Sequence, residues 1–354
     1  MRFLNISNLP ILLSSCLLIS IGVLVIYSSS PELAFQQLLY AVFGVILFLF
    51  VTQLDLHSMV NFIKPLYIIT ILLLITVYIL GIETRGSLRW IPLGFFNVQP
   101  SEFAKAVLIL QLGLFWNKHI PNWTNIFKSF LWTSPFTLLI FKQPDLGSAL
   151  TLLAIWIGML FASKISFKKV LILVLIAAVV IPSSWAFLHD YQRQRITGFL
   201  QPGSDPLGRG YNLIQSMIAV GSGQLLGMGL GRGTQSRLQF LPEFRTDFIF
   251  ASIAEEMGFV GSLIILSIYL FLLMMCLRLA SQADDRFYYL IIIGVFSMMI
   301  FQIFVNIGMN IGLLPITGIT LPLISYGGSS MIATLICLGL VASVAKKKRI
   351  TVTD

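Results

Sequence analysis

Long apolar runs recur along the whole 354-residue chain, and they limit its possible folds more than any other feature. Hydrophobic residues make up 57% of the chain and charged residues only 10%, so a water-soluble globule could not bury all this apolar surface. A membrane-spanning helix needs roughly 20 mainly apolar residues to cross a hydrocarbon core of about 30 Å. The sequence predicts ten such spans, at approximately 10–27, 33–51, 65–82, 103–117, 127–141, 146–161, 170–188, 248–277, 288–307 and 329–345. We therefore expect an all-α integral membrane protein that forms one domain over residues 1–354.

The cysteines and histidines argue against several common kinds of site. The three cysteines lie far apart within apolar runs, and we predict neither a disulfide framework nor a thiol metal site from Cys16, Cys276 and Cys337. The three histidines lie in separate segments, which disfavours a histidine metal cluster or a Ser/His/Asp triad built on His57, His119 or His189.

Basic residues predict which ends of the helices face the cytoplasm. The densest basic run beside a predicted span is the tail from Lys346 to Arg349, and the positive-inside rule places such a run in the cytoplasm. With ten spans, both termini then lie on that side of the membrane. Ten basic residues fall on the outside, where the rule gives no reason for them: Arg85, Arg89, Lys105, Lys142, Arg193, Arg195, Arg209, Arg232, Arg237 and Arg245. Translocation of long loops regardless of their charge is one explanation, and a site for an anionic ligand is the other.

One long hydrophilic segment, at about 189–246, is predicted to form a large external loop between the seventh and eighth spans. Within it Tyr211, Ile214 and Ile218 recur at helical spacing, which predicts a short helix along the membrane interface. The glycines between Gly221 and Gly233 superficially resemble a dinucleotide loop, but no strand precedes them. We expect flexible backbone close to another segment, and no nucleotide site.

A second irregular segment, 308–330, contains several Gly and Pro residues in apolar surroundings. Non-helical backbone at membrane depth persists only where protein or a water-filled cavity surrounds it. We expect this segment to cap or line an outward-facing cavity, and an ordinary external turn is the alternative.

Ionisable residues at predicted helix starts are the first candidates for a site. Glu102 and Lys105 are three residues apart where the fourth span begins, with Ser101 as a possible helix cap. Because charge in a membrane is costly, a ligand-binding role competes with a local ion pair. Asp145 begins the sixth span in a similar way, and helix capping is its main alternative.

The segment 240–258 contains the candidate that carries most of the argument. Thr246 is expected to cap the eighth membrane helix, which would place Asp247 in its first turn, where the helix dipole favours the carboxylate form. At about 100° per residue, Ala251, Ala254 and Gly258 would lie on the face of Asp247 and let a ligand approach it. Tight helix packing is the alternative use of these small residues.

Two further acids in this segment, Glu255 and Glu256, lie deeper in the same predicted helix. They face partly away from Asp247 at helical spacing. We expect them to serve as partners for buried donors or as a second carboxylate.

Five blocks of sequence resemble the SEDS family (shape, elongation, division and sporulation proteins) over nearly the whole chain. They are 86–106 (GSLRWIPLGFFNVQPSEFAKA), 142–149 (KQPDLGSA), 192–223 (QRQRITGFLQPGSDPLGRGYNLIQSMIAVGSG), 233–258 (GTQSRLQFLPEFRTDFIFASIAEEMG) and 312–330 (GLLPITGITLPLISYGGSS). The resemblance implies ten helices, a large external loop, and polymerisation of lipid II into glycan strands with release of undecaprenyl pyrophosphate. The blocks 192–223 and 233–247 read more like elongation members of the family than division members.

The same resemblance assigns roles to particular residues. Asp247 matches the essential aspartate of the family, and Glu102 and Lys105 match the polar pair of its Pro-Ser-Glu block. Arg245 departs from the family pattern, which usually has His before the Thr; a guanidinium stays protonated, so it could hold a phosphate but not accept a proton.

From these residues we hypothesise that Asp247 is the general base for an incoming sugar hydroxyl. The cations Arg85, Arg89, Lys105 and Arg245, together with Glu102 and Asp145, are the candidates for binding substrate and its pyrophosphate leaving group. The resemblance allows a divalent cation, Mg²⁺ or Mn²⁺, but no metal ligand can be named, and no organic cofactor is expected. It implies a class B penicillin-binding protein as the transpeptidase partner, with lipid II, the nascent glycan strand and membrane lipids as the other partners, and no nucleic acid.

Two functions of other classes remain as alternatives. A transporter or flippase for the same lipid would tend to show internal repeats and polar groups near the midplane, whereas these charges gather at the outer lip. A non-catalytic scaffold for wall synthesis would tolerate replacement of Asp247.

Overall fold

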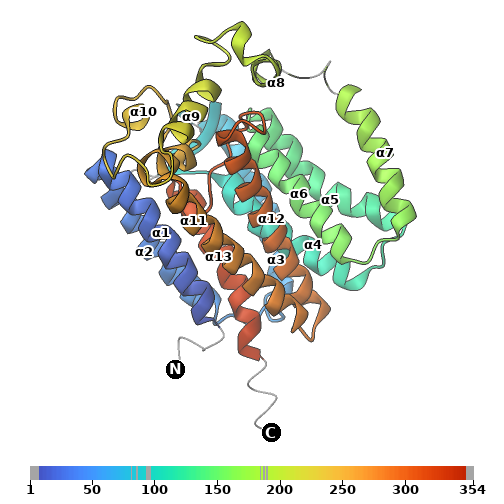
Figure 1. Cartoon of the computed structure of the whole chain (residues 1–354). Coiled ribbons are helices and arrows are strands. Elements are labelled where there is room, and N and C mark those ends of the chain that lie inside the picture. The colour runs from blue at the N-terminus through green and yellow to red at the C-terminus, as the bar shows by residue number, and fades with distance from the viewer. Residues whose placement is uncertain are drawn as a thin grey trace.

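The computed structural model describes residues 8–80, 82–84, 87–92, 97–183, 185, 188 and 190–347. Within these residues, ten long helices lie at the ten predicted spans and form a bundle (Figure 1): α1 (Leu9–Ser29), α2 (Pro31–Val51), α3 (Val60–Leu80), α4 (Pro100–Lys118), α5 (Trp123–Lys142), α6 (Leu146–Ala162), α7 (Phe167–Ser183), α11 (Ile249–Ser281), α12 (Arg286–Asn310) and α13 (Gly328–Lys347). By length and apolar composition alone, α1, α2, α3, α11 and α12 can each cross a bilayer. The start of α1 and the end of α13 lie at the same end of the bundle. The predicted all-α membrane fold is confirmed.

The centre of the bundle is formed by α4 and α12, whose side chains are buried over most of their length. Small residues let these helices approach closely, as is common in membranes. A Cβ on Gly294 of α12 would lie 2.8 Å from Ile109 of α4 and 2.9 Å from Met159 of α6. At the edge of the bundle stands α7 (Figure 1), with exposed Leu, Ile and Val side chains suited to contact with lipid.

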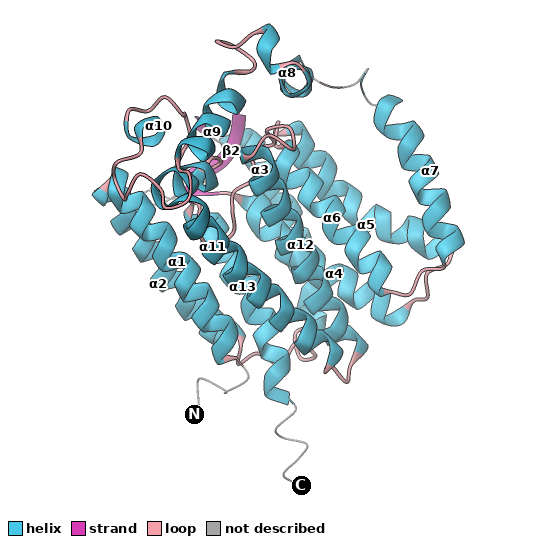
Figure 2. Ribbon diagram, in the orientation of Figure 1, coloured by secondary structure: helices cyan, strands magenta, loops and turns pink. Residues whose placement is uncertain are grey.

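A small antiparallel sheet joins α3 to α4, and it was not predicted. Its strands are β1 (Ile82–Thr84), β2 (Ser87–Pro92) and β3 (Asn97–Val98), in the order β1-β2-β3. Ile82 pairs with Trp90, and Ile91 pairs with Val98. The sheet lies at the end of the bundle near α9 (Figure 2), and it carries Arg89 on its central strand.

Between α7 and α11 the described residues form α8 (Asp190–Leu200), the short 3-10 helix η2 (Pro202–Ser204), α9 (Tyr211–Ser222) and α10 (Thr234–Arg237). The helix predicted from Tyr211 onward is confirmed as α9. His189, at the predicted start of this loop, lies outside the described residues.

The glycine-rich stretch after α9 packs against a break in α11. At Gly258 the backbone of α11 is non-helical, with φ 67° and ψ −164°. Main-chain groups of residues 223–229 satisfy the groups that this break leaves free: Phe259 N donates to Gln224 O (2.9 Å), and Met228 N donates to Glu255 O (2.9 Å). The expectation of glycine backbone close to another segment is therefore confirmed.

The segment between α12 and α13 has no regular helix, as predicted, and protein surrounds it. The fully buried amide of Gln37 donates to Ser325 O (3.0 Å) and accepts from Gly327 N (3.2 Å). Tyr269 donates its hydroxyl to Pro322 O. These side chains supply the hydrogen bonds that non-helical backbone would otherwise lack inside a membrane.

Candidate active site

A cavity of about 1300 Å³ opens at the end of the bundle where α4, α6 and α13 begin and α12 ends. The 239–248 segment, α8 and the 316–320 segment complete its wall. Every described site candidate lines it: Arg89, Glu102, Lys105, Asp145, Arg245 and Asp247. Arg85, the remaining candidate, lies outside the described residues. The 308–330 segment lines this cavity through residues such as Gly318 and Thr320, as predicted.

Asp247 precedes helix α11 instead of lying in its first turn, so that part of the prediction is wrong. Phe248 occupies the N-cap position without a side-chain cap bond, and the Thr246 hydroxyl donates to Glu243 instead. The predicted lane of Ala254 and Gly258 is used for tight packing: a Cβ on Gly223 would lie 1.8 Å from Ala254 O. Asp247 is reached through the cavity and not along a helix face.

The surroundings of the half-buried Asp247 raise the pKa of its carboxyl from 3.8 to about 6. Burial is the main cause, because loss of solvent penalises the charged form. The nearby negative charge of Glu243 also raises this pKa, and the cations Arg195 and Arg89 oppose it. A carboxyl with this pKa is largely ionised at neutral pH and can accept a proton.

Glu102 and Lys105 form a buried ion pair in the first turns of α4, with 2.6 Å between Lys105 Nζ and Glu102 Oε2. The local ion pair given as one alternative is therefore present, and both residues also line the cavity. Ser101 is not the cap: α4 begins at Pro100 and its N-cap residue is Gln99. The Ser101 hydroxyl has no hydrogen-bond partner among the described residues.

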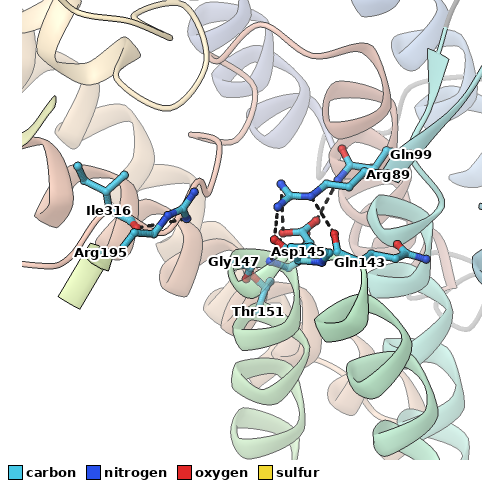
Figure 3. Close-up of polar contacts among 10 residues, drawn as sticks. Arg89, Gln99, Gln143, Asp145, Gly147, Thr151, Arg195 and Ile316 are labelled. Carbon is cyan, nitrogen blue, oxygen red and sulfur yellow. Dashed lines mark hydrogen bonds and ion pairs between the residues drawn. The ribbon is translucent and has the colours of Figure 1, made fainter. Parts of the chain in front are cut away.

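Asp145 caps α6 and also belongs to a polar cluster on the cavity wall. Its carboxylate accepts from Ser148 N (3.1 Å) and from Gln99 Nε2 (3.1 Å), and lies 4.0 Å from the Arg89 guanidinium. Arg89 also donates to the carbonyl oxygens of Gln143 and Pro144, which lie in the turn between α5 and α6 (Figure 3). The capping alternative is thus correct, and it does not remove Asp145 from the cavity.

A second arginine faces this cluster, and the sequence analysis did not include it among the site residues. Arg195 of α8 donates to Ile316 O (3.4 Å), and in Figure 3 its guanidinium and that of Arg89 reach toward one another from opposite sides. A Cβ on Gly318 would lie 3.5 Å from Asp247 Oδ2 and 3.8 Å from Arg195. Two sequence signals pointed to Arg195: its position in the block 192–223 and its place among the ten external basic residues. Neither indicated that it would lie beside Asp247, because α8 is remote in the chain from the other site residues.

Three charged residues of the 240–258 segment are held by neighbours. Arg245 donates to Ser29 Oγ (2.9 Å) at the end of α1 and lies over the Phe244 ring at 4.4 Å. Glu255 accepts from the main-chain N–H groups of Gln235 and Ser236, and Glu256 accepts from the Ser28 hydroxyl (2.9 Å). Both glutamates are buried, so their predicted use as partners for buried donors is confirmed.

The site does not fit a metal ion held by protein side chains alone. Among the described residues no group of three or more His, Cys, Asp or Glu side chains converges. A Mg²⁺ ion commonly takes one or two carboxylates and completes its ligands with substrate phosphates and water. A divalent cation bound here would therefore depend on substrate phosphates and water for most of its ligands.

Residues 8–350 match the family model described as "Cell cycle protein", which joins FtsW, RodA and SpoVE. The chain belongs to this family. The expected SEDS membership is confirmed, and the chain is therefore a multi-pass membrane protein.

Several curated relatives are similar over most of their length. The peptidoglycan glycosyltransferase MrdB of Escherichia coli K12 is 42% identical over 85% of this chain and 82% of its own. The stage V sporulation protein E of Bacillus subtilis 168 is 37% identical over 97% of this chain and 98% of its own. The probable peptidoglycan glycosyltransferase FtsW of Geobacter strain M18 is 36% identical over 99% of both chains.

Solved structures show the same fold. A chain from a study of structural coordination of polymerization and crosslinking by a peptidoglycan synthase complex is 33% identical, with a TM-score of 0.83, and 96% of this chain and 97% of that chain are covered. The rod shape determining protein RodA of Thermus thermophilus is 28% identical, with a TM-score of 0.72 over 95% of this chain and 96% of its own.

Proposed function

We propose that this chain is a peptidoglycan glycosyltransferase that polymerises lipid II into glycan strands at the outer face of the cytoplasmic membrane. The observation that carries the proposal is the cavity, which brings a carboxylate able to accept a proton and several cations together at one end of a membrane bundle. Family membership and relatives named as peptidoglycan glycosyltransferases support it.

In the proposed reaction Asp247 removes the proton from the attacking sugar hydroxyl of one lipid-linked unit. The hydroxyl oxygen forms a bond to the anomeric carbon of the strand, and the bond from that carbon to the pyrophosphate oxygen breaks. The proton stays on Asp247 until it passes to solvent, and the electron pair leaves with the pyrophosphate.

Two cations of the cavity, Arg89 and Arg195, are suited to the charge that develops on the leaving group. Arg89 and Arg195 approach the same space from β2 and α8, and both lie near enough to Asp247 to lower its pKa. Lys105 has its charge balanced by Glu102, so we assign this pair to binding polar groups of the substrate and not to neutralising pyrophosphate.

The distribution of basic residues supports an external cavity. The end of the bundle opposite the cavity, where α13 ends, carries the basic residues Lys118, Lys164 and Arg278. The positive-inside rule places that end in the cytoplasm, with both termini, and the cavity outside.

We also propose a role in cell elongation and shape, with a transpeptidase of the class B penicillin-binding type as partner. The 42% identity to MrdB and the likeness to a rod shape determining protein support the first assignment over a division role. The second is supported by the similar chain in a complex that couples polymerization with crosslinking.

The test is strand formation by the purified chain in liposomes containing labelled lipid II. We expect the Asp247→Asn variant to form no strands, while the matched Asp190→Asn variant works as wild type, because Asp190 is 92% exposed outside the cavity. Strands made by Asp247→Asn at the wild-type rate would reject the mechanism. A parallel reaction with a chelator measures any requirement for a divalent cation.

The same liposomes separate the two rival functions. A lipid II flippase would move labelled lipid between leaflets without forming strands. A scaffold would form no strands in the purified system, and Asp247→Asn would still support wall growth in cells.

A further inference from the structure

Helix α12 is mainly apolar but carries three buried amides, and two of them, Asn306 and Asn310, bond to the main chain of the site. Asn306 and Asn310 are both 0% exposed, and they lie one turn apart on the same face. An amide buried in a membrane bundle is costly unless it is hydrogen-bonded. Their partners therefore indicate why these two residues are present.

Both amides bond to the main chain of Asp247. Asn306 Nδ2 lies 2.9 Å from Asp247 O, and Asn310 Nδ2 lies 3.1 Å from the same oxygen. Asn306 Nδ2 also donates to Ile319 O (2.7 Å), which ties the segment carrying Gly318 to the same point. Two donors on a single carbonyl fix the peptide from which the Asp247 side chain projects.

Asn310 also replaces the missing helix cap of α11. Phe248 at the N-cap has no polar side chain, and Asn310 Oδ1 instead accepts from Ala251 N at 3.0 Å. One side chain of α12 thus holds the carbonyl of Asp247 and the first turn of the helix that follows it. This double contact fixes the angle at which the chain enters α11.

The two residues before Asp247 are held from outside as well. Ser325 Oγ donates to Thr246 O at 2.6 Å, and Tyr326 N donates to Arg245 O at 2.8 Å. Three successive carbonyl groups, 245 to 247, therefore accept hydrogen bonds from α12 or from the segment before α13. None of these contacts uses the Asp247 carboxylate, which stays free to face the cavity.

We propose that Asn306 and Asn310 are positioning residues that aim the Asp247 carboxylate at the reacting hydroxyl. The inference rests on the proposed function of Asp247 and deepens it. Without the two amides, the Asp247 peptide can rotate and its side chain can move into the wetter part of the cavity. The carboxylate then loses both its alignment with the hydroxyl and the burial that sets its acidity.

The experiment compares Asn306→Leu and Asn310→Leu with Gln111→Leu in the liposome polymerisation assay. Gln111 is an equally buried amide on α4 that does not line the cavity, so it controls for loss of a polar group inside the bundle. We expect kcat to fall at least tenfold in both Asn variants, with KM changed less than twofold. We also expect the acid limb of the pH–rate profile to move to lower pH in both Asn variants and to stay unchanged in Gln111→Leu.

A milder variant keeps the test informative where a leucine variant fails to fold. Ser325→Ala removes only the hydroxyl that holds the neighbouring carbonyl, and we expect a smaller loss of kcat with a limb shift in the same direction. Wild-type kcat and an unshifted limb in the folded variants would overturn the proposal. Loss of activity only in proportion to unfolded protein, with an unshifted limb, would overturn it as well.

Asp247→Asn, assayed alongside, separates the two levels of inference. If it is inactive while the Asn306, Asn310 and Ser325 variants match the Gln111 control, the positioning role fails and the proposed function stands. If Asp247→Asn polymerises at the wild-type rate, the proposed function fails first.

Discussion

The acid limb of the pH–rate profile for polymerisation should report the environment of Asp247. Burial and Glu243 raise the pKa of this carboxyl to about 6, so its ionised fraction changes within an accessible pH range. For a general base with that pKa, the ionised fraction is about 0.9 at pH 7 and about 0.1 at pH 5. The apparent kcat/KM should therefore fall about tenfold between these values. An unperturbed aspartate, with a pKa of about 3.9, would give almost no change over this range.

Two variants should move this limb in opposite directions. Glu243→Gln removes a negative charge that raises the pKa of Asp247, so the limb should move to lower pH. Arg195→Gln removes a positive charge that lowers it, so the limb should move to higher pH. Both side chains line the cavity, and opposite shifts cannot come from a general loss of folding.

The assay is the initial rate of strand formation from labelled lipid II in liposomes, at subsaturating substrate, over a series of pH values. The kcat/KM profile reports the free enzyme, in which the environment described above applies. Equal rates at pH 5 and pH 7 would refute the raised pKa. Shifts of the same sign in both charge variants would refute the electrostatic account.

Three further predictions concern individual contacts. Lys105→Met should leave Glu102 buried without its partner and cost roughly 3–5 kcal/mol of stability. Adding Glu102→Gln should restore the melting temperature but not strand formation. Recovery of activity in the double variant would argue against a substrate-binding role for this pair. Gly318→Ala, at φ +76° and against the Asp247 carboxylate, should lower activity at least tenfold, while Gly203→Ala, with open space around it, should be neutral. Asp247→Asn should raise the melting temperature at pH 7.5, because the raised pKa of Asp247 means that folding disfavours its carboxylate form above about pH 6. This pKa shift corresponds to roughly 3 kcal/mol of stability, reduced to about 1 kcal/mol for a half-buried group. That gain should vanish below about pH 4, where both states are protonated, and its persistence there would contradict the assignment.

The sequence was enough to predict the membrane fold, because a bilayer demands long apolar helices and leaves few other solutions. The ten long helices and α9 follow from local composition and periodicity, as do the irregular segments. The candidates Asp247, Glu102, Lys105, Asp145 and Arg89 were chosen because charge at a membrane lip is costly, and all of them line one cavity. Their roles in catalysis and substrate binding stay predictions.

Helix boundaries and strand pairing were harder to predict from the sequence. Thr246 and Ser101 both look like helix caps, yet α11 and α4 start elsewhere. In α11 a distant side chain, Asn310, accepts from the first turn in place of a local cap. The β2 strand was missed because its pairing partners are short segments on either side of it, with weak local patterns.

The tertiary structure alone decided how the site is assembled. Asn310 bonds to Asp247, and Arg195 lies near it, only because the fold brings α12 and α8 to the same cavity, and no local pattern encodes such long-range proximity. The raised pKa of Asp247 likewise depends on burial and on charges remote in the chain. The apolar periodicity of a helix is set by its own residues, whereas the position and acidity of a carboxylate are set by whatever the rest of the chain places around it.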